Sequence, residues 1–80
     1  MGVKKAVARR LQELCAQRQL AVNALANLAG VTPSTVYSIL DPARKDVGIV
    51  AIKKLCDGLG MPLEEFFSGE VFNALEQEII

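Results

Sequence analysis

Three hydroxyl-bearing side chains, Ser34, Tyr37 and Ser38, recur at a spacing that places them on one arc of an α-helix. Serine hydroxyls donate and accept hydrogen bonds, and the tyrosine adds an aromatic ring with a polar tip. Arg44 and Lys45 follow a few residues later and can pair with anions. These residue types favour recognition of a polar, anionic surface through hydrogen bonds and ion pairs.

The sequence offers little for catalysis or metal binding. It contains no histidine, and its two cysteines, Cys15 and Cys56, are far apart and lie among apolar residues. The usual Cys/His zinc sites are therefore excluded, and both cysteines are expected to be buried free thiols. Glu64 and Glu65 are typical of a helix N-terminus, and no acid–base pair stands out. We therefore predict a protein that is not an enzyme, with no catalytic residues, no metal and no cofactor.

Charge is divided unevenly along the chain, although the net charge is zero. All nine lysines and arginines lie at or before Lys54, whereas six of the nine acids follow Cys56. The first 56 residues therefore carry a net charge of +6, and the remainder carries −6. Such a division indicates one side that faces a polyanion and one acidic side, or else ordinary solvated helix faces.

Two short helices are predicted over residues 22–29 and 33–40, and the second carries the hydroxyl-bearing arc. Gly30 fits the position after the first helix, where a left-handed backbone favours glycine. Thr32 offers an N-cap oxygen, and Pro33 fits the first turn, where no N–H is needed. This is the layout of a helix-turn-helix, whose second helix can enter the major groove of DNA.

Three more helices complete the predicted fold, which is compact, all-α and without strand-like alternation. Their apolar residues recur at three- and four-residue spacing over residues 4–18, 49–58 and 63–67. Gly58 and Gly60 are expected to end the second of these helices. The charged segment that follows the helix-turn-helix is predicted to be a loop.

A C-terminal amphipathic tail over residues 68–80 follows a DNA-binding domain that we place at residues 1–67. Its apolar residues Phe72, Leu75 and Ile79 align on one face of a helix. The tail is therefore either a sixth helix that packs on its own domain or a segment that forms a dimer or binds a partner. The sequence leaves both alternatives open.

No apolar run approaches the roughly 18 residues that a membrane span needs. The apolar stretch after Lys4 and Lys5 is also too short for a signal peptide. We therefore expect no membrane partner and a cytoplasmic location.

The spacing of small and apolar residues resembles the lambda-repressor-like helix-turn-helix family, the XRE-type group of phage and bacterial regulators. The matching positions are Arg10-Leu11, Leu20, Leu25-Ala26, Gly30-Val31, Thr32, Ser34-Thr35-Val36, Ile39, Ile52, Leu55, Leu59-Gly60 and Phe66-Phe67. The resemblance covers about residues 5–67 and implies five helices, with the helix-turn-helix at the second and third. It implies a repressor-like transcription regulator that binds double-stranded DNA sequence-specifically as a homodimer, with no small-molecule effector evident.

The resemblance also assigns residues to the DNA interface. The base-reading positions of the family fall on Pro33, Ser34, Tyr37 and Ser38, and its second-helix phosphate contacts fall on Ala21, Val22 and Asn23. Its loop phosphate contacts fall near Arg44 and Lys45. In this arrangement the helix over residues 33–40 would lie in the major groove, and the phosphate contacts would set its register.

The sequence departs from the family pattern at several of these positions. Ala21 and Val22 replace a polar cap and a glutamine at the start of the second helix, which removes a cap and a phosphate contact. Leu40 stands where a glutamate often pairs with the first-helix arginine. Arg10 is therefore expected to be free to bind phosphate.

The recognition arc lacks Arg, Asn and Gln, the side chains that make bidentate base contacts. Specificity would then depend on DNA shape, ordered water and dimer spacing. An alternative function is a protein-interaction module of the same fold, such as an antitoxin or a repressor partner, with weak DNA binding. DNA binding that weakens as salt is raised would separate the two functions.

Overall fold

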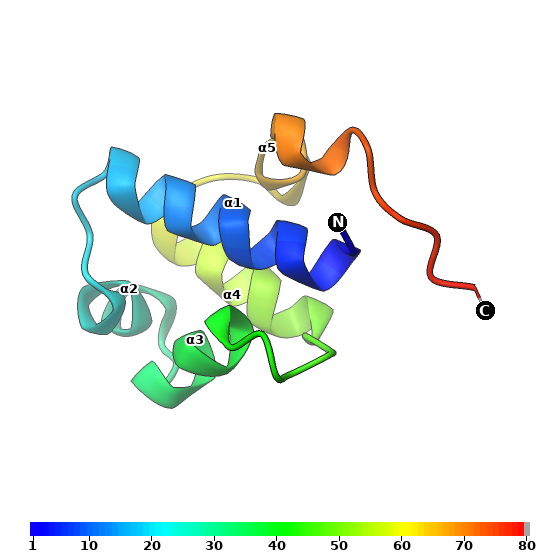
Figure 1. The fold of residues 1–80 in the computed structure, drawn as a ribbon. Coiled ribbons are helices and arrows are strands. Elements are labelled where there is room, and N and C mark those ends of the chain that lie inside the picture. Colours follow the sequence, from blue (N-terminus) through cyan, green and yellow to red (C-terminus); the bar gives the residue numbers. More distant parts are fainter. Residues whose placement is uncertain (80) are drawn as a thin grey trace.

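Five α-helices and one short 3₁₀ helix follow one another within residues 1–79, the part of the chain that the computed structural model describes. They are α1 (Val3–Gln17), α2 (Val22–Ala29), α3 (Pro33–Leu40), α4 (Ile49–Leu59), α5 (Leu63–Phe66) and the 3₁₀ helix η1 (Glu70–Phe72). Figure 1 shows α2 and α3 below α1, α4 behind it, and α5 on the side of α1 opposite to α3. The predicted all-α architecture of five helices is confirmed.

The hydrophobic core lies where the four longer helices meet α5 and the segment that precedes it. Its members are Val7, Leu11, Leu14, Leu25, Ala26, Val36, Ile39, Ile52, Leu55, Cys56, Leu59, Met61 and Phe66. α2 packs against both α3 and α4, and α1 packs against α3. Most of these buried positions follow the helical spacing seen in the sequence, so the amphipathic faces dictate which sides of the helices meet.

Gly58 is the penultimate residue of α4, so this helix extends one residue beyond the predicted range of 49–58. A Cβ atom on Gly58 would lie only 2.8 Å from the backbone nitrogen of Ala29 in α2. The glycine is therefore needed because the backbones of α2 and α4 approach closely at this point. Gly60, with a φ of 71°, is the residue that ends α4.

The C-terminal tail forms no sixth α-helix within residues 68–79, contrary to one of its two predicted forms. Only η1 is helical there. The ring of Phe72 lies 6.2 Å from that of Phe66 and 5.0 Å from that of Phe67, measured between ring centroids. This aromatic cluster anchors the start of the tail to the domain.

Residues 73–79 are irregular and run past the N-terminal end of α1 (Figure 1). The backbone N–H of Glu76 donates a hydrogen bond to the carbonyl of Met1 at 3.0 Å. Leu75 and Ile79 are exposed by 38% and 81%. In this conformation Ile79 therefore contributes little to the hydrophobic core.

Both cysteines are free; Cys15 is half-buried and Cys56 is buried. Burial raises the pKa of each thiol, and the neighbouring carboxylate of Asp57 raises the pKa of Cys56 further. The thiols are therefore protonated and poorly reactive near neutral pH.

Within residues 1–79, no group of three or more His, Cys, Asp or Glu residues could hold a metal ion. No helix in the same range is long and apolar enough to cross a membrane.

Candidate nucleic-acid interface

α3 buries its aliphatic face in the core and turns the hydroxyl-bearing arc outward. Ser34 and Tyr37 are exposed, Tyr37 by 57%, and Ser38 is half-buried. Pro33 is exposed at the first turn of the same helix. The structure therefore brings the four predicted base-reading residues together on one outward surface.

The turn between α2 and α3 fixes the direction in which this surface points. Gly30 adopts a left-handed conformation, with a φ of 69°, and ends α2 as the sequence predicts. The N–H of Val31 then donates to the carbonyl of Ala26 at 3.0 Å, which closes the turn. The small side chain of Ala26 is buried at this crossing, so it allows the two helices to approach.

A cluster of hydroxyl groups surrounds the N-terminus of α3. Oγ1 of Thr32 accepts a hydrogen bond from the N–H of Thr35 at 3.4 Å, which confirms the predicted cap. The same oxygen lies 2.9 Å from Oγ of Ser34 and 3.1 Å from Oγ1 of Thr35. The hydroxyl of Ser34 is therefore oriented by its neighbour. The sequence predicts the cap at Thr32, but it does not predict that the side chain of Thr35 joins this cluster.

The first turn of α2 has no side-chain cap, as the sequence predicts. Ala21 occupies the N-cap position and makes no capping hydrogen bond. The backbone N–H groups of this turn are therefore available to water or to an anion. Asn23 is exposed in the same turn, and its amide can donate a further hydrogen bond.

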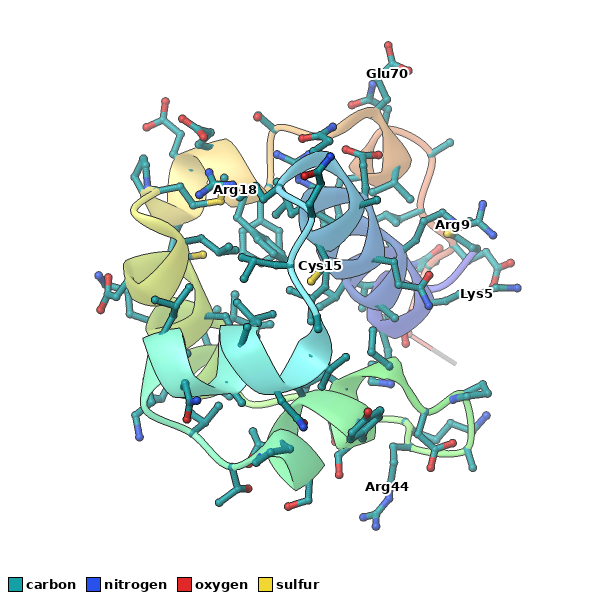
Figure 2. The ribbon with its side chains drawn as sticks, turned by 90° about the vertical axis from the view of Figure 1, so that its left-hand side faces the viewer. Lys5, Arg9, Cys15, Arg18, Arg44 and Glu70 are labelled. Carbon is teal, nitrogen blue, oxygen red and sulfur yellow. The ribbon has the colours of Figure 1, made fainter. Side chains whose placement is uncertain are left out.

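The loop between α3 and α4 is organised by Asp41. Its carboxylate accepts from the N–H of Ala43 at 2.9 Å, and its carbonyl accepts from the N–H of Arg44 at 3.1 Å. Figure 2 shows the side chain of Arg44 reaching away from the helices. Arg44 and Lys45 are exposed, and neither pairs with a carboxylate of residues 1–79. Both are thus available to an anionic partner.

Arg10 is not free to bind phosphate, which corrects the prediction for this residue. Its side chain is buried, with 8% exposed. Nε donates to the carbonyl of Phe66 at 2.7 Å, one Nη donates to the carbonyl of Glu65 at 2.9 Å, and the other pairs with Glu13 at 2.6 Å. In the absence of the family's glutamate on α3, the guanidinium turns to the carbonyl groups at the end of α5. Arg10 is therefore a structural residue that joins α1 to α5.

Lys5 and Arg9 of α1 were not predicted as site residues, yet both are exposed near the loop that carries Arg44. Figure 2 shows them on the side of the molecule toward which this loop extends. Together with Arg44 and Lys45 they line a groove of about 580 Å³. Their four-residue spacing marks an exposed basic face of α1, but only the folded chain shows which loop lies opposite.

Comparison with known protein families matches residues 6–66 to a family described as a helix-turn-helix domain. Among solved structures, the chain is similar to prophage Lp1 protein 11, known from a crystal structure. The two are 33% identical with a TM-score of 0.80, over 94% of this chain and 100% of the other. No curated protein sequence matches this chain. The two matches agree with the resemblance to lambda-repressor-like, XRE-type domains.

Proposed function

The chain belongs to the helix-turn-helix domain family, and on that premise we propose that it is a repressor-like transcription regulator that recognises specific sequences in double-stranded DNA. The observation that carries the proposal is the outward arc of α3, which Ser34, Tyr37 and Ser38 share. α3 would lie in the major groove with these residues and Pro33 against the base edges. The similarity to a prophage protein supports a domain of phage type.

Phosphate contacts would come from the two segments that flank α3 in the chain. The uncapped first turn of α2 and Asn23 offer hydrogen-bond donors, and Arg44 and Lys45 offer positive charge. The base-reading arc carries no side chain that makes bidentate base contacts. A single mismatch in the site should therefore cost about 1 kcal/mol, at the low end of the usual range.

Binding measured against salt concentration tests this function. The logarithm of the binding constant for a selected duplex should fall linearly with the logarithm of the salt concentration. Replacing Arg44 and Lys45 together by alanine should weaken all duplexes alike and reduce the slope by about 1.8. Ser38→Ala should instead change base preference mildly and leave the slope unaltered. Wild-type affinity and slope in the double variant would contradict the loop contacts.

We also infer that the protein binds DNA as a homodimer in the cytoplasm, where bacterial and phage DNA is read. Regulators of this kind usually bind two half-sites, and one outward arc with few strong base readers needs a second copy for specificity. Sedimentation of the complex should show two chains on one duplex. Their recognition helices should lie about 34 Å apart.

The alternative function is a protein-interaction module with weak DNA binding. It is favoured by the net charge of zero and by exposed apolar side chains at Leu28, Ile49 and Val50, which are 57%, 60% and 65% accessible. An absence of DNA binding even at low salt would support this alternative and contradict the proposed regulator.

A further inference from the structure

A groove of about 580 Å³ lies between the N-terminal half of α1 and the loop that follows α3. Basic side chains line both of its walls: Lys4, Lys5 and Arg9 on α1, and Arg44 and Lys45 on the loop. Leu40 and Pro42 line it where α3 ends. Figure 2 shows Lys5 and Arg9 reaching outward on the side of the molecule that holds the loop. The groove therefore begins at the C-terminal end of the recognition helix and continues onto α1.

Most of the positive charge in the groove is not compensated by the protein itself. Nζ of Lys4 donates to the carbonyl of Asp41 at 3.0 Å and so ties the two walls together. Within residues 1–79, none of the four remaining basic residues pairs with a carboxylate. Glu78 is the one acid that the described part of the chain contributes to the lining, and its carboxylate accepts from the N–H of Val3 at 3.4 Å. A groove with this charge attracts an anionic ligand.

We propose that this groove binds the sugar–phosphate backbone of the DNA that α3 contacts, so that Lys5 and Arg9 extend the phosphate contacts of the loop onto α1. The proposal rests on the proposed DNA-binding function. Its support is continuity, because Arg44 and Lys45 belong both to the loop beside α3 and to the groove. A strand leaving the end of α3 would meet basic side chains on both walls, and each neutralised phosphate adds to affinity by releasing counterions. Glu78 at the rim opposes this contact.

The test is to replace Lys5 and Arg9 together by glutamine and to measure DNA binding across a salt series. Loss of two phosphate contacts should weaken binding about 60-fold at 0.1 M salt and reduce the salt slope by about 1.8, without changing base preference. The matched control replaces Lys53 and Lys54 of α4 by glutamine, because it removes the same charge from residues outside the groove lining. This control should retain the wild-type slope. Glu78→Gln should shift affinity in the opposite direction, with tighter binding at low salt.

The outcomes separate this proposal from the function on which it rests. If the wild-type protein binds DNA but the Lys5 and Arg9 variant keeps its affinity and slope, the groove proposal is wrong and the DNA-binding function stands. Equal losses in the α4 control would also overturn the groove, because the effect would then follow from net charge alone. If the wild-type protein binds no DNA at low salt, both proposals fail. Binding to a poly-glutamate peptide is measured in parallel. If the variant binds DNA like the wild type but no longer binds this peptide, the groove belongs to an acidic protein partner instead.

Discussion

Arg10 stabilises the fold in a way that its position in the helix-turn-helix family pattern does not indicate. Its guanidinium satisfies the carbonyl groups of Phe66 and Glu65 in a buried setting. Arg10→Ala should therefore lower the free energy of unfolding by about 2–4 kcal/mol, because it leaves buried carbonyls without donors. Arg10→Lys should recover only part of this loss, since a lysine does not reproduce the planar fork of donors. Chemical denaturation monitored by circular dichroism measures both changes.

The matching control is Arg9→Ala, whose exposed side chain should change the stability by no more than about 0.5 kcal/mol. The salt slope of DNA binding for folded Arg10→Ala should equal that of the wild type, and a reduced slope would restore a phosphate role for Arg10. The sequence could not predict this pairing. Two of the three acceptors are backbone carbonyls 55 and 56 residues away, and no side-chain pattern marks them.

Helix boundaries set by local chemistry agree with the prediction, whereas contacts between distant segments could not be predicted. The left-handed Gly30 and the capped start at Thr32 and Pro33 are local, and the structure reproduces both. Gly58 looks like a helix terminator in the sequence, but its structural role is to leave room for the backbone of α2, and α4 ends at Gly60. The tail likewise has a helical pattern, yet Phe72 packs on the domain from a 3₁₀ helix and Ile79 remains exposed.

Gly58→Ala tests the close approach of α2 and α4. The added methyl would gain helix propensity, but it would lie 2.8 Å from backbone atoms that have little room to move. We expect a net loss of about 1–3 kcal/mol in the free energy of unfolding, measured by urea denaturation. Gly48→Ala is the control, since a Cβ there meets nothing within 4 Å, and it should cost less than about 1 kcal/mol. Equal effects at both positions would contradict a packing role for Gly58.

Over the whole molecule, the uneven charge seen in the sequence has a structural counterpart. Basic residues of α1 and of the α3–α4 loop gather around one groove, and the acidic tail reaches its rim at Glu78. The tail also pairs its Glu76 with the amino terminus at 3.5 Å. The hydroxyl-bearing arc could be predicted because it lies on one helix, α3. The groove could not be predicted, because its walls come from segments that only the fold brings together.

Two truncations separate the anchoring role of Phe72 from the role of the rest of the tail. A chain that ends at Asn73 keeps the aromatic cluster and loses mainly exposed residues, so its melting temperature should fall by less than about 4 °C. A chain that ends at Phe67 also loses Phe72 and Gly69. The side chain of Arg10 lies so close to Gly69 that an added Cβ would be only 3.0 Å from Cδ of Arg10. That chain should be destabilised by about 2–4 kcal/mol.

We expect the chain that ends at Asn73 to keep the mass of a homodimer in light scattering, because exposed apolar residues of α4 remain on the helical body. A fall to the mass of one chain would instead show that residues beyond Asn73 build the dimer.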